Sequence, residues 1–115
     1  MTHKMRLNAS PFYKIKNGEK TIELRLYDEK RRLMSEGDII EFTNVQNPNE
    51  VLKCEIVKLH IFDSFYELYA TLPLTKCGYT DENVNNAKAE DMNEYYSVGE
   101  QEMYGVVGIE LKICD

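Results

Sequence analysis

The clearest pattern in the chain is a strict alternation of apolar and polar side chains near its N-terminus. The residues concerned follow one another as Lys20-Thr21-Ile22-Glu23-Leu24-Arg25-Leu26. Such alternation is typical of a strand with one face in the core. The other face would carry Thr21, Glu23 and Arg25 in a row, with Lys20 at the strand's entrance. A surface strand can carry such groups for solubility alone. The basic turn and the Gly37-Asp38 pair that follow favour the lining of a site.

The rest of the N-terminal half is predicted to alternate short strands with turns and one helix. A helix over 10–16 is indicated by Ser10 as N-cap and Pro11 in the first position, and Asn17-Gly18 would end it. Strands are predicted at 4–7, 20–26 and 39–45. Polar turns are predicted at 27–32, where a single helical turn also fits, and at 35–38.

The C-terminal half begins with a hairpin loop over 44–50 and a long strand over 51–62 that can hold a bulge. A helix over 63–70 follows, with Asp63 or Ser64 as its cap and Glu67 completing a capping box. Residues 81–96 are predicted to be helical, and 98–103 to form a further helical turn. Two glycines in the closing strand over 104–113 indicate a kink or a close backbone approach.

These elements predict an α+β fold around a small, curved sheet or barrel, with residues 1–115 as a single domain. The 115 residues are 43% hydrophobic and 30% charged, which is ordinary for a globular protein. No apolar run approaches the ~20 residues of a membrane span, and the N-terminus resembles no signal peptide. We therefore expect no membrane partner.

Three cysteines without a CxxC pair favour free thiols in the cytoplasm over a disulfide framework. The two histidines lie far from them in the sequence, so no zinc site and no cofactor is predicted.

Charge is distributed unevenly along the chain. Residues 1–32 hold nine Lys or Arg against four acidic residues, a net of +5, whereas the remainder has a net of −11. A general nucleic-acid binder is normally basic overall, and this chain has a net charge of −6. A local basic patch can still bind a small anionic or polar ligand, or a short single strand. A solvated, polar surface is the alternative interpretation.

The alternating strand offers three chemical interpretations. Lys20 and Glu23 are predicted to form an ion pair, and Arg25 can share the carboxylate. Together they could hydrogen-bond the edge of a base and one phosphate without any reaction. In a cleft, Lys20 could instead polarise a carbonyl while Glu23 acts as general base for water. The third interpretation is a surface ladder of ion pairs that contributes ~0–1 kcal/mol.

Further candidates lie outside this strand. Tyr95 and Tyr96 are the aromatic pair predicted to stack on a base, whereas most other aromatic residues are expected to pack in the core. Arg31 lies in the basic turn 30–32 and can contact a phosphate, although a solvated turn explains it equally well.

Five motifs in order resemble a known family. They are Gly18-Glu19-Lys20-Thr21-Ile22-Glu23-Leu24-Arg25, Gly37-Asp38-Ile39-Ile40-Glu41-Phe42, Asp63–Leu68, Asp91–Tyr96 and Tyr104–Ile109. Their order along nearly the whole chain resembles the ASCH domain, a member of the PUA-like superfamily of small β-barrels. The resemblance implies a PUA-like curved barrel, mixed and mainly antiparallel, with inserted short helices. It also implies a module that binds RNA or handles nucleotides.

One small bacterial branch of this family hydrolyses the amide of acetylcytidine with a lysine, a threonine and a glutamate. The resemblance places the lysine at Lys20. The position of the threonine is occupied by Glu23, and Thr21 lies a full pleat repeat away from it. The glutamate would fall between Glu90 and Glu94. The chain therefore departs from this branch at a residue central to its chemistry.

The sequence thus favours binding of RNA, a nucleotide or a modified nucleoside, with no DNA specificity. Lys20, Thr21, Glu23, Arg25, Arg31, Tyr95 and Tyr96 are the predicted ligand-binding residues. An amidohydrolase that acts on an acylated pyrimidine nucleoside is the first alternative, with Lys20, Glu23 and Glu90 as its catalytic residues. The second is a protein-interaction module whose contact surface is the acidic stretch 81–102. The oligomeric state is left open.

Overall fold

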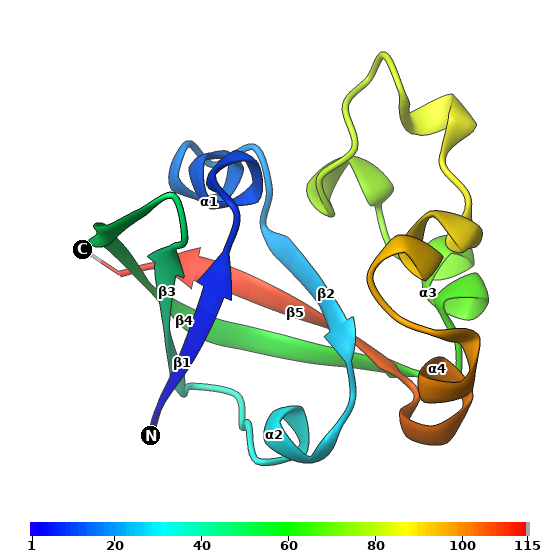
Figure 1. The fold of residues 1–115 in the computed structure, drawn as a ribbon, viewed down its shortest axis with the longest axis horizontal. Coiled ribbons are helices and arrows are strands. Elements are labelled where there is room, and N and C mark those ends of the chain that lie inside the picture. Colours follow the sequence, from blue (N-terminus) through cyan, green and yellow to red (C-terminus); the bar gives the residue numbers. More distant parts are fainter. Residues whose placement is uncertain (115) are drawn as a thin grey trace.

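Five strands form one curled sheet in the computed structural model, which describes residues 1–114 (Figure 1). The strands are β1 (Thr2–Leu7), β2 (Ile22–Leu26), β3 (Ile39–Asn44), β4 (Asn47–Phe62) and β5 (Val106–Ile113). Their spatial order is β1-β3-β4-β5-β2. The pair β1–β3 is parallel and the other three pairs are antiparallel. The sheet curls into a half-barrel, which confirms the predicted α+β fold class.

Short helices connect the strands. The α-helices are α1 (Ala9–Lys16), α2 (Glu29–Arg32), α3 (Phe65–Thr71) and α4 (Val98–Tyr104). Three 3-10 helices, η1 (Leu74–Lys76), η2 (Val84–Asn86) and η3 (Ala89–Glu94), lie in the long connection between α3 and α4. This connection occupies one side of the molecule, beside β2 (Figure 1). No helix in the described part of the chain has the length and apolar character of a membrane span.

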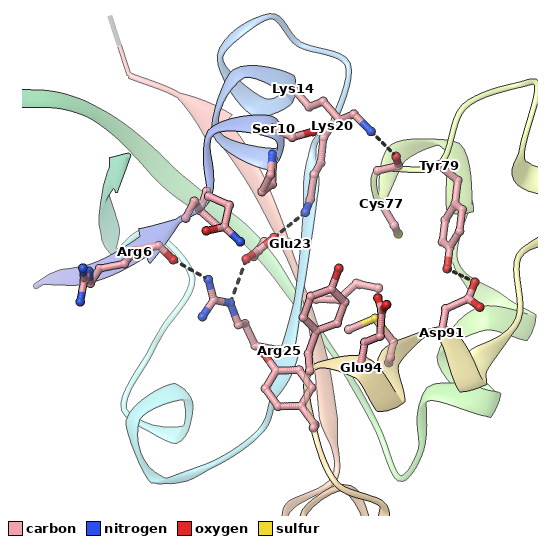
Figure 2. Close-up of a pocket in the computed structure, with 18 of the residues that line it drawn as sticks. Arg6, Ser10, Lys14, Lys20, Glu23, Arg25, Cys77, Tyr79, Asp91 and Glu94 are labelled. Carbon is pink, nitrogen blue, oxygen red and sulfur yellow. Dashed lines mark hydrogen bonds and ion pairs between the residues drawn. The ribbon is translucent and has the colours of Figure 1, made fainter. Parts of the chain in front are cut away.

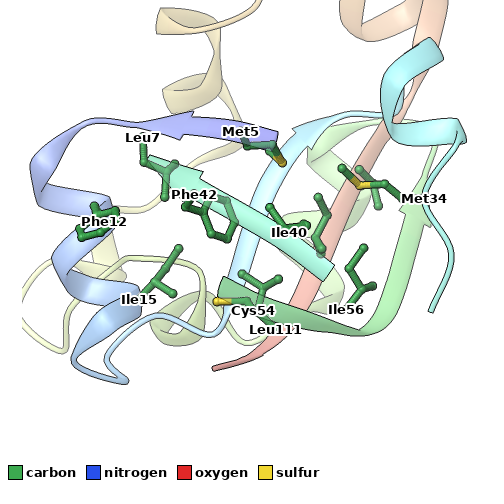
Figure 3. Packing of buried hydrophobic residues seen from close by; sticks show 12 residues of the cluster. Met5, Leu7, Phe12, Ile15, Met34, Ile40, Phe42, Cys54, Ile56 and Leu111 are labelled. Atoms are coloured by element: carbon green, nitrogen blue, oxygen red, sulfur yellow. The ribbon is translucent and has the colours of Figure 1, made fainter. Parts of the chain in front are cut away.

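The larger hydrophobic core fills the inside of the curled sheet (Figure 3). Phe12 and Ile15 of α1 pack there against Ile40 and Phe42 of β3, and all four side chains are almost fully buried. Burial of each large apolar side chain contributes about 1.5–3 kcal/mol. Helix α1 therefore packs over one end of the half-barrel. Along the chain it connects β1 and β2, the two edge strands of the sheet.

A second hydrophobic core lies on the opposite face of β2 and β5. It joins Ile22, Leu24 and Leu26 to Phe65 and Leu68 of α3. The predicted apolar face of β2 is therefore confirmed. The other face of β2 is not a solvent-exposed face. In the register of β2 and β5, Glu23 pairs with Ile109 and Arg25 pairs with Val107. Directly paired residues share a sheet face, so both charged residues lie on the inner side of the curl.

Two irregularities predicted from the sequence are present in the sheet. The register of β4 against β5 shifts between Ile56 and Lys58, which confirms the bulge. Gly108 allows the side chain of Leu72 to lie close to the backbone of β5, because a Cβ on Gly108 would lie 2.7 Å from Cδ1 of Leu72. The hairpin is tighter than the predicted loop over 44–50, and β4 already begins at Asn47.

The predicted start of the first helix is wrong by two residues. Asn8, not Ser10, is the N-cap, and α1 begins at Ala9. Pro11 then occupies the third helical position, where the missing N–H costs nothing because the first backbone donors have no intrahelical acceptor. The N–H of Ala9 is satisfied by Oε1 of Gln46. Gln46 thus caps this end of α1. Because it is distant from α1 in the sequence, no local sequence pattern indicates it.

The predicted helix over 81–96 is also wrong. This segment forms only the short helices η2 and η3. The backbone of Ala87 and Lys88 is extended, and this break separates the two short helices. In contrast, the predicted cap of α3 is confirmed, because Ser64 accepts a hydrogen bond from the N–H of Glu67. The predicted capping box is only half formed, since no bond from the Glu67 side chain back to Ser64 occurs within residues 1–114.

Candidate functional site

A cavity of about 710 Å³ opens beside β2 (Figure 2). One wall comes from the end of β1, from α1 and from β2. The other comes from α3 and from the connection between α3 and α4. The charged and polar residues lining it are Arg6, Asn8, Ser10, Lys14, Lys20, Glu23, Arg25, Tyr69, Tyr79, Asn83, Asp91, Glu94, Tyr95 and Tyr96. Its volume falls within the range of small-molecule sites.

The predicted ion pair between Lys20 and Glu23 is present at this cavity. Nζ of Lys20 lies 2.6 Å from Oε1 of Glu23, and Nε of Arg25 donates to Oε2 at 2.8 Å. Each cation thus takes one carboxylate oxygen, which confirms that Lys20 and Arg25 share the carboxylate of Glu23. Only 4% of Glu23 is exposed. The third sequence interpretation, an exposed ladder of ion pairs, does not fit this burial.

The charge state of Glu23 follows from two opposing effects. Burial acts to raise the pKa of this carboxyl, but the charges of Lys20 and Arg25 and their hydrogen bonds outweigh it. The pKa of Glu23 therefore lies below its ordinary value, and the group is a carboxylate at neutral pH. A carboxylate with both oxygens bonded to cations is a weak base. It holds the two cations in place at the cavity.

Arg25 also connects the two edges of the sheet. Its Nη2 donates to the backbone carbonyl of Arg6 in β1 at 3.1 Å. Strands β1 and β2 are the outermost strands of the sheet, so this bond spans the open side of the half-barrel. The planar guanidinium can bond Glu23 and Arg6 at once because its donors point in fixed, diverging directions.

A second contact joins α1 to the far wall. Nζ of Lys14 donates to the carbonyl of Gly78 at 2.9 Å. Gly78 has φ of +116°, a conformation that favours glycine. The methylenes of Lys20 pack beside it, since a Cβ on Gly78 would lie 3.6 Å from Cδ of Lys20. Gly78 thus presents its carbonyl to Lys14, and its lack of a side chain leaves room for the methylenes of Lys20.

Two tyrosines and an aspartate form a hydrogen-bonded chain on the far wall. The Tyr79 hydroxyl donates to Oδ2 of Asp91 at 2.7 Å, and the hydroxyls of Tyr69 and Tyr79 are 2.8 Å apart. Burial and these bonds raise the pKa of Tyr79 far above its ordinary value. The bonds from Tyr79 and from the N–H of Lys88 lower the pKa of Asp91. The phenol is therefore neutral and the aspartate ionised.

The predicted stacking pair is divided between two environments. Tyr96 stacks on Phe65 of the second core, with ring centroids 6.2 Å apart. Tyr95 is 66% exposed. Both line the cavity, but only Tyr95 offers a largely free ring face to a ligand.

Other predicted residues lie outside the cavity lining. Thr21 is held through its backbone, whose N–H donates to the carbonyl of Lys76. Arg31 bonds the carboxylate of Asp28, the N-cap of α2. Glu90 is exposed, and the acidic residues from this stretch that line the cavity are Asp91 and Glu94.

Several lining residues were not singled out from the sequence. Arg6, Lys14, Tyr69, Tyr79 and Asp91 come from five different segments, and no spacing rule connects them. Only Asp91 carried a signal, as the first residue of the fourth motif. Cys77 also lines the cavity, and burial raises the pKa of its thiol to about 11, which makes it a poor nucleophile at neutral pH.

No cluster of three metal-binding side chains occurs within residues 1–114. The cavity lining places cations on one wall and the carboxylates of Asp91 and Glu94 on the other.

Comparisons with known proteins agree with this architecture. The crystal structure of the archaeal hypothetical protein PH0355 is 31% identical, covers 99% of this chain and 100% of its own, and superposes with a TM-score of 0.80. The solution structure of protein PF0455 from Pyrococcus furiosus is 29% identical, with coverages of 100% and 99% and a TM-score of 0.76. No curated protein matches. The ASCH domain matches residues 5–114, and the chain therefore belongs to the ASCH domain family.

Proposed function

We propose that this protein binds a nucleotide or nucleoside unit, either free or within RNA, in the cavity beside β2. The observation that carries the proposal is the fixed pair of cations held by Glu23. An ammonium has three N–H donors and a guanidinium five. Lys20 uses one of them on Glu23, and Arg25 uses one on Glu23 and one on Arg6. The remaining donors are available to the oxygens of a phosphate or a base.

The cavity also suits the shape of such a ligand. The exposed ring of Tyr95 provides a stacking surface, and stacking of a base on an aromatic side chain contributes about 1–3 kcal/mol. Lys14 and Arg6 add positive charge to the same wall as Lys20. A flat base with a sugar and a phosphate matches this combination of an aromatic surface and a cationic wall.

Charge argues against a general nucleic-acid binder. The chain has a net charge of −6, and non-specific affinity for duplex DNA depends on neutralising many phosphates. A ligand bound through one nucleotide unit needs only the local cations of the cavity. The three free thiols suit a reducing compartment such as the cytoplasm.

Binding is favoured over hydrolysis by the state of Glu23. A general base needs a pKa near the working pH, whereas that of Glu23 is lowered and both its oxygens are bonded. The protein-interaction alternative has less support, because the segment 81–96 contributes a wall of the cavity itself.

The test is an NMR titration of the 15N-labelled protein with the four ribonucleoside 5′-monophosphates and with a short single-stranded RNA. We expect shift changes centred on residues 20–25, and affinity lowered at least tenfold by Lys20→Ala. Lys53→Ala removes the same charge from an exposed position on β4 and serves as the matched control. An unchanged spectrum with every probe would refute the proposal and favour an interaction module.

A parallel assay separates binding from hydrolysis. The protein is incubated with acetylcytidine, and the release of acetate is followed. We expect no release above the level of the Lys20→Ala variant. Release that depends on Lys20 would establish the amidohydrolase instead.

A further inference from the structure

The Tyr69–Tyr79–Asp91 chain has a single possible direction of its protons. Tyr79 has one hydroxyl proton, and it is donated to the carboxylate of Asp91. The contact of 2.8 Å between the two tyrosine hydroxyls must therefore use the proton of Tyr69. Tyr69 donates to Tyr79, and Tyr79 donates to Asp91. Neither hydroxyl has a proton left for a ligand.

This wall consequently presents hydrogen-bond acceptors. The oxygen of Tyr69 retains its lone pairs, and Oδ1 of Asp91 accepts no hydrogen bond from the described residues 1–114, since both bonds to this carboxylate go to Oδ2. Glu94 adds a further carboxylate to the same side of the cavity. A ligand group that meets Tyr69 or Oδ1 of Asp91 must therefore supply N–H or O–H donors.

The opposite wall has the reverse character. Lys20 and Arg25 carry only donors, and both oxygens of Glu23, the carboxylate between them, are bonded to these cations. Figure 2 shows Arg25 on β2, Lys20 just before this strand, and the Tyr79–Asp91 bond across the cavity from them. The cavity is thus divided into a donor side and an acceptor side. This division restricts which ligand edges fit.

We propose that Asp91 and Tyr69 accept hydrogen bonds from an exocyclic amino group of the bound base, while Lys20 and Arg25 donate to its carbonyl or phosphate oxygens. The inference rests on the proposed nucleotide-binding function and adds a selectivity for amino-bearing bases. An oxo group in place of the amino group would face a carboxylate and a lone pair, and the unpaired acceptors would weaken binding.

Matched pairs of ligands test this selectivity by calorimetry. CMP and UMP differ in an amino against an oxo group, and GMP and IMP differ by the amino group alone. Because hydrogen bonds to charged groups are stronger than those between neutral groups, we expect the amino member of at least one pair to bind roughly tenfold more tightly or better.

Two variants test the residues that are responsible. Asp91→Asn keeps an acceptor for the N–H of Lys88 but removes the charge, and it should reduce the ratio of affinities within the pair at least threefold. Tyr79→Phe keeps the ring and releases the proton of Tyr69 toward the cavity, so it should improve binding of the oxo ligand. Glu102→Gln changes the charge equally at an exposed position of α4 and should leave the ratio unchanged.

The possible outcomes separate this inference from the proposed function. Binding of nucleotides without preference for the amino member of either pair would overturn the inference and leave nucleotide binding intact. A preference that survives both Asp91→Asn and Tyr79→Phe would also overturn it. If no nucleotide binds to the wild-type protein, both proposals fail together.

Discussion

Nζ of Lys20 and Oε1 of Glu23 lie 2.6 Å apart in an ion pair that is almost closed to solvent. Arg25 completes the cluster through the second carboxylate oxygen and reaches β1 through the carbonyl of Arg6. One carboxylate thus holds two cations, and one of these cations connects the edge strands of the sheet. The cluster therefore affects both the ligand cavity and the stability of the fold.

Replacement of Glu23 by Gln should destabilise the protein by about 2–3 kcal/mol. The amide oxygen can accept from one cation only, and the amide NH₂ then faces the other cation. The loss is smaller than the ~3–5 kcal/mol of a fully buried pair, because Lys20 and Arg25 line the cavity and keep 11% and 17% of their side chains exposed. Urea denaturation followed by circular dichroism measures the change.

A matched control for this variant is Glu36→Gln, which removes one charge from an exposed turn. It should change the free energy of unfolding by no more than about 0.5 kcal/mol. Equal stabilities of the two variants would contradict the structural role of Glu23.

Acid should weaken the wild-type fold partly through Glu23. Because its pKa is lowered in the folded state, its contribution is complete above the ordinary glutamate pKa of 4.5 and disappears as the pH falls from there through the folded pKa. Melting temperatures measured between neutral pH and pH ~3 should fall less steeply for Glu23→Gln than for the wild type.

The acid dependence of that variant should not vanish. The pKa values of Asp38 and Asp91 are also lowered, in both cases mainly by a side-chain hydrogen bond. Their contributions to the free energy of unfolding are therefore also lost as the pH falls. Parallel curves for the wild type and Glu23→Gln would show that Glu23 is ionised no more readily in the folded chain than in the unfolded one.

Gly108→Ala should destabilise the protein by about 1–3 kcal/mol through overpacking. The added Cβ would lie 2.7 Å from Cδ1 of Leu72 and 3.2 Å from Cγ2 of Ile22. Both contacts are in the second core, where α3 and its C-terminal end cover β2 and β5. Thermal unfolding of the variant measures the loss.

Gly99→Ala is the matched control for this substitution. Gly99 lies in α4, and a Cβ added to it would meet no atom of residues 1–114 within 4 Å. Alanine there should therefore stabilise the protein by a few tenths to about 1 kcal/mol. Opposite signs for the two variants are expected. A loss of stability in both would assign the effect to the glycine backbone and not to packing.

Patterns in the sequence predict well what local physics controls. The alternation from Ile22 to Leu26 identifies β2, and Ser64 with Glu67 identifies the start of α3. Each of these rests on neighbours within a few residues. The start of α1 is not predicted by a local pattern, because the backbone N–H of Ala9 donates to the side chain of Gln46, which is distant in the sequence. The predicted helix over 81–96 fails at Ala87 and Lys88, whose extended backbone divides the segment into two short helices.

The sequence by itself determined the strand that carries Glu23 and Arg25, although β2 begins at Ile22 and Lys20 lies just before it, and the order of motifs that is shared with the ASCH domain. It could do so because side-chain spacing along a strand is fixed by the period of two. Only the tertiary structure decided that Glu23 is buried, since the curl of the sheet covers the second face of β2. It also brought Tyr69, Tyr79 and Asp91 to the wall opposite Lys20, because the connection between α3 and α4 packs beside β2.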